Sequence, residues 1–280
     1  MNLIIDSGAT KATWTLTDGS QVVMQTYTAG LHPLLMPDET LRALMLEAQQ
    51  RGITFPSHIH YYGTGCRSEQ ARERIAQLLR ESFPTATTID VQTDLLGAAR
   101  ASCGWTHGIV CILGTGSNAC LYDGKQILAN RGGYGFILGD EGSGAAMGRQ
   151  LLSDFLHDLL PPTIRTALIE RYQLSTDAII EATYRRAAPS RFLASFAPFL
   201  LEHNTDAHIR HIIEQQLTLF LQKCVCPYAA AIPVHFIGSI AWHFQAFVHE
   251  ALQLQQLQLG SISADPMGGL VAFHQPPIAP

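Results

Sequence analysis

The sequence has few charged residues and no excess of positive charge. Charged residues make up 15% of the 280 residues, and the formal net charge is −5. Nucleic acid binding depends on lysine and arginine side chains that displace counterions from phosphates. We therefore expect no nucleic-acid partner. The chain also has no acidic or basic run that would indicate a charged tail.

Long apolar stretches are absent as well. No segment approaches the roughly 20 consecutive apolar residues of a membrane-spanning helix. The chain opens with MNLIID, which leads directly into a predicted strand without the charged and apolar segments of a secretion signal. We expect a cytoplasmic protein with no membrane partner.

Metal-binding patterns are also missing. There is no CxxC pair and no Cys/His cluster at zinc-finger spacing. We interpret the scattered cysteines as reduced structural thiols, and they are Cys66, Cys103, Cys111, Cys120, Cys224 and Cys226. His58 and His60 would share one face of a strand, but no third ligand accompanies them, so exposure is favoured over metal binding.

The pattern that is present is an alternation of strands and helices. Strands are predicted over 3–5, 13–17, 21–27, 58–63 and 87–91, and helices from residue 37, over 68–83 and over 94–103. The same order starts again with apolar or alternating segments at 109–113, 119–122 and 126–130. A shift of 105 positions places Thr10 on Thr115, and Asp18-Gly19 on Asp123-Gly124.

This repeat predicts two duplicated α/β domains. We expect an N-terminal domain over 1–106 and a C-terminal domain over 107–280, with a helical insertion at about 141–230 and a last helix that can pack back on the N-terminal domain. Ligands bind at the carboxyl ends of parallel strands, so paired loops from both halves are expected to face one cleft.

Two turns contain the small and hydroxyl residues that suit phosphate binding. The first is Asp6-Ser7-Gly8-Ala9-Thr10-Lys11, and the second is Gly114-Thr115-Gly116-Ser117-Asn118. Small residues let backbone N–H groups approach an anion, and a nearby Asp can hold hydrated Mg²⁺. The alternative is an ordinary glycine turn. Two matching turns favour a pair that grips one polyphosphate, without a Walker A motif, since no GxxxxGK[ST] occurs.

Two further segments could carry chemistry. Asp94 directly follows a predicted strand and starts a helix, so it is either a helix cap or a general base at the ligand-binding edge. The glycines in Arg131–Gly135 and Gly139–Gly144 recur too densely for packing alone, because each costs backbone entropy. They indicate a close-fitting loop in which Asp140 offers acceptors to a polyol, or else a flexible loop before a helix cap.

Four segments together resemble a known family. DSGATKATW, TDLLGAARA, LGTGSNACL and GGYGFILGDEGS, in this order, are similar to N-acetylglucosamine kinases, which are often grouped with BadF/BadG-type ATPases. The resemblance covers residues 6–143, and HFIGSIAW and ADPMGGLVAF resemble later parts of the family. It implies two ribonuclease H-like α/β domains with a central ATP/sugar cleft, as in sugar kinases, actin and heat-shock ATPases. It also implies ATP and Mg²⁺ as cofactors, an amino sugar as substrate, and a homodimer.

The resemblance assigns roles to residues of this chain. Asp94 would be the catalytic base, and Asp6 would organise Mg²⁺ through water. The phosphates of ATP would be held by Gly8, Thr10, Lys11, Gly114, Thr115 and Gly116, and the adenosine would lie beside Gly238 and Ser239. The sugar would be held by His32, Asp94, Ser117, Asn118, Gly133, Tyr134, Gly135 and Asp140.

The sugar itself stays open at this point. Family members often carry Asn in a G-x-N-P stretch, whereas this chain reads Gly30-Leu31-His32-Pro33. The predicted reaction is phosphorylation of N-acetylglucosamine to its 6-phosphate, and glucosamine, N-acetylmuramic acid and N-acetylmannosamine are alternatives. Two other functions remain: an ATPase activator of 2-hydroxyacyl-CoA dehydratases, which needs cysteine ligands for an iron–sulfur cluster, and a non-catalytic sugar sensor.

Overall fold

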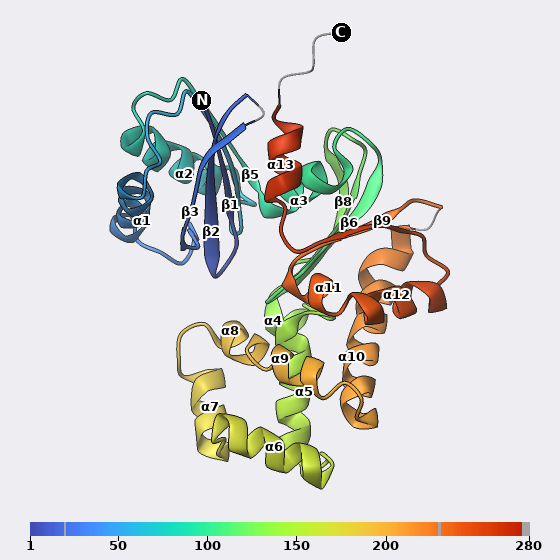
Figure 1. Ribbon diagram of the computed structural model, residues 1–280. Coiled ribbons are helices and arrows are strands. Elements are labelled where there is room, and N and C mark those ends of the chain that lie inside the picture. Colours follow the sequence, from blue (N-terminus) through green and yellow to red (C-terminus); the bar gives the residue numbers. More distant parts are fainter. Residues whose placement is uncertain (20, 229–230, 276–280) are drawn as a thin grey trace. The chain divides into compact units, whose positions relative to one another are not determined.

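The computed structural model describes residues 1–19, 21–228 and 231–275 and divides into two compact units (Figure 1). Unit 1 consists of Met1–Thr106, Asp123–Ile127 and Asp265–Pro280. Unit 2 consists of His107–Tyr122 and Leu128–Ala264. Each unit is built on its own five-stranded sheet.

The sheet of unit 1 has the strand order β3-β2-β1-β4-β5. Its strands are β1 (Asn2–Ser7), β2 (Lys11–Asp18), β3 (Gln21–Ala29), β4 (His58–Gly63) and β5 (Thr88–Thr93). The first three form an antiparallel meander, whereas β4 and β5 run parallel to β1. Strand β1 is central, and its residues Leu3, Ile4 and Ile5 are fully buried, which explains its unbroken apolar run.

Helices cover both faces of this sheet. On one face α1 (Asp38–Gln50) and α2 (Glu69–Ser82) pack against a core that includes Leu3 and Ile5. Ile4 points the other way and packs against α13 (Met267–Phe273), which lies beside α3 (Asp94–Cys103). This alternation follows from the period-two geometry of a strand.

The sheet of unit 2 repeats the order of the first. Its strands are β6 (Gly108–Leu113), β7 (Ser117–Tyr122), β8 (Ile127–Gly132), β9 (Val234–Ile237) and β10 (Leu259–Ser263), in the spatial order β10-β9-β6-β7-β8. Again a three-stranded meander is extended by two strands parallel to the first. The two matching sheets confirm the predicted α/β fold with a duplicated half.

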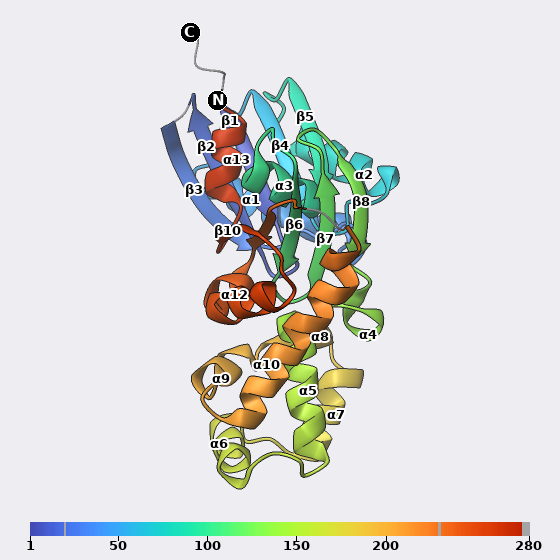
Figure 2. The same cartoon turned by 90° about the vertical axis from the view of Figure 1, so that its right-hand side faces the viewer.

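The rest of unit 2 is helical. The segment from β8 to β9 contains α4 (Gly135–Leu138), α5 (Gly144–Leu156), α6 (Pro162–Tyr172), α7 (Thr176–Tyr184), α8 (Pro189–Ala194), α9 (Ala197–Glu202), α10 (Ala207–Phe220), a π-helical turn over Leu221–Val225 and a 3₁₀ turn over Cys226–Tyr228. Helices α5 to α10 gather at one end of the sheet (Figure 2). After β9 come α11 (Ser239–His243) and α12 (Gln245–Leu254).

Helix α13 returns to unit 1 after the chain has passed through unit 2. The ring of His274 stacks on His60 with 3.7 Å between centroids, and its Nε2 lies 2.7 Å from the hydroxyl of Tyr62. Phe273 stacks on Trp105 at 4.5 Å. His60, predicted to be exposed, is therefore half-buried in a contact between α13 and the sheet.

Among the described residues, no helix combines the length and apolar character needed to cross a membrane. The longest helices, α2 and α10, each have 14 residues.

Two neighbouring glycines of α13 provide a test of its packing on α3. A methyl group at Gly269 would lie 2.2 Å from the carbonyl oxygen of Ala101, whereas one at Gly268 would have no atom within 4 Å. Gly269→Ala should lower the free energy of unfolding by about 1–3 kcal/mol, the usual cost of overpacking. Gly268→Ala should raise it by up to about 1 kcal/mol through helix propensity. Urea unfolding of both variants checks this, and equal effects would contradict the packing.

Candidate functional site

Carboxylates gather in unit 1 near the carboxyl end of β1. Asp6 is the fifth residue of β1, and Asp94 follows β5. The pKa of Asp6 is raised to about 7, mainly by burial and also by the charges of Asp94 and Asp265, while Lys11 has an opposing effect. Like charges held near one another disfavour ionisation. The negative charges of Asp6, Asp94 and Asp265 are therefore only partly balanced by Lys11.

Asp94 is held in place by its neighbours. Its Oδ1 accepts a hydrogen bond of 2.9 Å from the backbone N–H of Leu95, and the Thr64 side chain is a second hydrogen-bond partner. Burial raises the pKa of Asp94, and these hydrogen bonds partly offset that effect. The N-cap of α3 is Thr93, whose Oγ1 accepts from the N–H of Leu96 at 3.2 Å. Capping of α3 thus does not require the Asp94 side chain.

The turn between β1 and β2 is closed by backbone contacts. Gly8 N–H donates to the carbonyl of Lys11 at 3.0 Å, and Gly30 N–H donates to the carbonyl of Thr10 at 3.2 Å. A methyl group at Gly30 would lie 2.0 Å from the carbonyl oxygen of Gly8. The side chain of Thr10 is exposed, and the Lys11 ammonium lies 4.0 Å from the ring centroid of Tyr27.

His32 lies on the same side of unit 1. Its ring packs on the backbone of Gly65, since a methyl group there would be 2.7 Å from His32 Cε1. Gly65 directly follows Thr64, the partner of Asp94. Burial lowers the pKa of His32. The structure thus brings Asp6 and Asp94 near each other and places His32 against the residue that follows the partner of Asp94.

In unit 2 the predicted second turn rests on the start of α5. Gly114 N–H donates to the carbonyl of Gly116 at 3.0 Å. The N–H groups of Gly144 and Ala145 donate to the carbonyls of Gly114 and Thr115 at 2.9 and 3.1 Å. The turn therefore has a fixed conformation.

Asp140 contacts this turn from a strained position. Its Oδ1 accepts from the N–H of Ser117 at 3.2 Å, and a methyl group at Gly116 would lie 2.9 Å from its Oδ2. Asp140 has φ of 62°, which is unfavourable for a residue other than glycine. Burial raises its pKa, and the hydrogen bond from Ser117 opposes this.

Asn118 and the glycine-rich segment lie next to Ser117. Gly133 N–H donates to the carbonyl of Ser117 at 3.0 Å, and the side-chain amide of Asn118 lies against Gly133. Asn130 Nδ2 donates to Asn118 Oδ1 at 2.6 Å. Asn130 was missed in the sequence because it carries no motif. Tyr134 and Gly135 are exposed at the start of α4.

A cavity of about 360 Å³ opens beside the same turn. Its polar lining comes from Gly114, Thr115, Ser239 and His243. The apolar lining consists of Ala194, Ala197, Pro198, Leu201, Ile240 and Phe244. The residues from α8 and α9 were missed, because short apolar segments in a helical region resemble ordinary core. Gly238 precedes the lining residue Ser239, and a methyl group at Gly238 would be 2.3 Å from the carbonyl oxygen of Leu113.

Within the described part of the chain, no group of three or more His, Cys, Asp or Glu side chains is arranged to hold a metal ion. A carboxylate that acts on a cation through bound water needs no such group.

Comparison with known proteins identifies the family. The sequence profile described as the BadF/BadG/BcrA/BcrD ATPase family matches residues 5–212. The chain belongs to this ATPase family. The matched range contains every predicted site residue except Gly238 and Ser239.

Two solved structures resemble this ATPase family member over nearly its whole length. A Porphyromonas gingivalis protein, provisionally assigned as an N-acetylglucosamine kinase, is 37% identical, with a TM-score of 0.94 over 98% of this chain and 99% of its own. A Chromobacterium violaceum protein with the same provisional assignment is 17% identical, with a TM-score of 0.74 over 97% and 98%. At that identity the second likeness shows the fold alone.

One curated relative also matches. The glucosamine kinase GspK of Vibrio cholerae is 28% identical over 169 residues, which are 58% of this chain and 55% of GspK. The chain thus spans about half the length of the curated relative that it matches.

The crowding around Asp6 predicts a pH-dependent stability. Its pKa is raised from 3.8 to about 7, so the stability that the protonated form provides is full below about pH 4 and is lost as pH rises through 7. Asp6→Asn should therefore be more stable than wild type at pH 8, by about 1–4 kcal/mol, since one pKa unit corresponds to about 1.4 kcal/mol.

The measurement is urea unfolding without divalent cations between pH 4 and 8. The stability difference between wild type and Asp6→Asn should vanish toward pH 4. Asp18→Asn, at an exposed aspartate of β2, is the control. Parallel pH profiles for wild type and Asp6→Asn would show that Asp6 is not crowded.

Proposed function

We propose that the protein is an ATP-dependent kinase that phosphorylates an amino sugar, with N-acetylglucosamine converted to its 6-phosphate. The observation that carries this proposal is the partly buried carboxylate of Asp94, which lies after a parallel strand, is held by Thr64 and is not required to cap its helix. The relatives assigned as kinases of amino sugars support the substrate class.

Unit 1 supplies the base in this proposal. Asp94 accepts the proton of the sugar hydroxyl that attacks the γ-phosphate, and its raised pKa makes it a stronger base than an exposed aspartate. Thr10, with Gly8 and Lys11, contacts the phosphates. His32 binds the sugar from the segment that packs on Gly65.

The surroundings of Asp6 fit a hydrated Mg²⁺ ion. Burial and two other carboxylates raise the pKa of Asp6, and a nearby divalent cation would relieve that unfavourable charge. Asp6 would hold Mg²⁺ through water. The ion would supply positive charge to the phosphates, on which phosphoryl transfer depends.

Unit 2 supplies the nucleotide site in this proposal. The cavity beside Gly114 and Thr115 has the apolar walls and the few polar groups typical of a site for a planar base. Gly116 completes the phosphate-binding turn, and Gly238 and Ser239 lie on the adenosine side. The sugar contacts of this unit are Ser117, Asn118, Gly133, Tyr134, Gly135 and Asp140.

The function is tested by ADP release with MgATP and a panel of glucose, glucosamine, N-acetylglucosamine, N-acetylmannosamine and N-acetylmuramic acid. Release that depends on one amino sugar, with N-acetylglucosamine the most active, is the expected result. Formation of the 6-phosphate is then checked by NMR of the product. If no sugar of the panel causes ADP release while ATP still binds, a dehydratase activator or a sugar sensor would be favoured.

The arrangement of the cysteines argues against the activator. An iron–sulfur cluster shared between subunits needs cysteine ligands at the surface. Five of the six cysteines are buried, and Cys226 is partly exposed.

Asp94→Asn should lower turnover by about 10²–10⁴-fold, the usual contribution of a general base. Thr93 is unchanged in this variant, so α3 keeps its N-cap and ATP binding should be retained. The measurements are kcat by coupled ADP release and ATP affinity by calorimetry, with Asp18→Asn as the control. A kcat within about threefold of wild type would exclude Asp94 as the base.

A further inference from the structure

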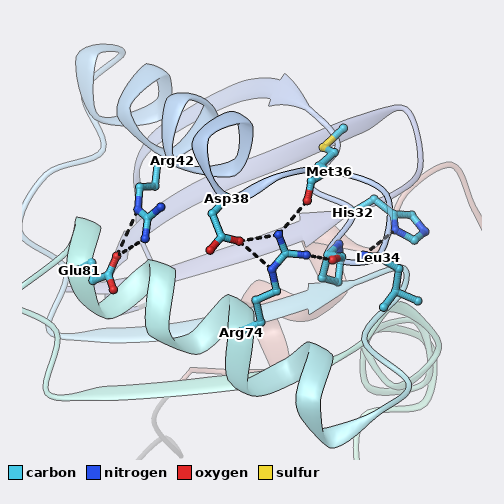
Figure 3. A network of polar contacts seen from close by, with 8 residues as sticks. His32, Leu34, Met36, Asp38, Arg42, Arg74 and Glu81 are labelled. Carbon is cyan, nitrogen blue, oxygen red and sulfur yellow. Dashed lines mark hydrogen bonds and ion pairs between the residues drawn. The ribbon is translucent and has the colours of Figure 1, made fainter.

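Arg74 of α2 is bound to the segment that carries His32 (Figure 3). Its guanidinium donates to the backbone carbonyls of Pro33 and Met36, the latter at 2.8 Å. It also donates through Nε to Asp38 Oδ1 at 2.7 Å, at the start of α1. The Arg74 side chain thus connects the end of this segment to α2, which carries it, and to α1.

The geometry uses what is particular to arginine. Nε, Nη1 and Nη2 all donate, to two carbonyls and one carboxylate. A planar guanidinium can serve such spread acceptors at once, whereas a lysine ammonium is a single point of charge on a flexible chain. Asp38 and the half-buried Arg74 side chain also form an ion pair.

The other end of the segment is fixed independently. Leu31 N–H donates to Ser7 Oγ at 2.8 Å, and the buried Tyr61 hydroxyl donates to the carbonyl of Leu31 at 3.1 Å. His32 lies between these anchors and Arg74. Its carbonyl accepts from Met36 N–H at 3.1 Å, and its Nδ1 accepts from Leu34 N–H at 3.3 Å.

We propose that Arg74 is a positioning residue that fixes the His32 ring against Gly65 for recognition of the sugar. This rests on the proposed kinase function and on the role of His32 in it. Arg74 donates to backbone carbonyls of this segment, so it acts on the ring through the backbone of residues 33–36. Without it, the segment would keep its connection to α1 and the Leu31 anchors but lose its hydrogen bonds to α2.

The same two helices contain a matched control. Arg42 of α1 forms an ion pair with Glu81 of α2 at 2.9 Å, with its Nε 3.2 Å from the same oxygen (Figure 3). Like the pair of Arg74 with Asp38, it joins α1 to α2. Its hydrogen bonds end on Glu81, far from the segment with His32. Loss of Arg42 therefore reproduces the loss of an α1–α2 ion pair without release of the segment.

The kinetic test compares Arg74→Leu, Arg74→Lys and Arg42→Leu with wild type on the most active amino sugar. Arg74→Leu should raise the KM for the sugar by about tenfold, as misplacement of a binding group does, while kcat and the KM for ATP change by less than about threefold. Arg74→Lys should resemble Arg74→Leu, and Arg42→Leu should resemble wild type. An equal rise in the sugar KM for both leucine variants would overturn the proposal.

A double mutant separates positioning from a general structural effect. If Arg74 acts through His32, Arg74→Leu should have little further effect on the sugar KM in a His32→Ala background. Additive effects of the two substitutions would overturn the proposal. Thermal melts of the single variants confirm folding, and Arg74→Lys serves if Arg74→Leu does not fold.

An NMR titration of His32, assigned with His32→Gln, gives a readout that needs no activity. Burial against Gly65 lowers the pKa of the ring. In Arg74→Leu the freed ring should titrate at higher pH, closer to an exposed histidine, whereas in Arg42→Leu it should titrate as in wild type. An unchanged His32 titration in Arg74→Leu would overturn the proposal.

A wild-type protein that is inactive on every sugar would instead refute the proposed kinase function, whatever the His32 titration shows.

Discussion

Crowded negative charge at the end of β1 is the constraint on which unit 1 depends. Asp6 continues a strand whose preceding residues are fully buried, so the core fixes the position of its backbone. Asp94 and Asp265 raise its pKa further, and Lys11 is the cation that opposes them. Natural structures keep such a conflict where function requires it, since burial of like charges costs stability.

The surrounding structure restrains these carboxylates through backbone and small residues. Thr93 caps α3, which leaves the Asp94 side chain to Thr64 and to the N–H of Leu95. Gly30 closes the first turn through contact with Gly8. In unit 2 the N–H of Gly133 donates to the carbonyl of Ser117 in the second turn, as the N–H of Gly30 donates to the carbonyl of Thr10 in the first. The duplication therefore extends from the strand order to the way each turn is closed.

Much of this could be predicted from the sequence, because the signals are local. Alternating or unbroken apolar runs identified β1 to β8, and two turns at equivalent positions indicated the repeat. Strand β10 escaped detection, since LGSIS has few buried residues and no clear alternation. The choice between a cap and a free carboxylate at residue 94 was also undecidable, because Thr93 and Asp94 are both good capping residues. The α8 and α9 lining of the cavity depends on tertiary packing that no local pattern encodes.

The return of α13 to unit 1 affects the order in which the protein can be completed. During synthesis, residues 1–106 leave the ribosome long before Met267–Phe273, which cover Ile4 and Tyr62. Until then, that face of the sheet is covered by α3 without α13. Unit 2 consists of residues that are all made before α13. The first unit to emerge is therefore the last to be completed. Until α13 packs on it, the apolar residue Ile4, close in sequence to Asp6, stays accessible to chaperones or to other chains.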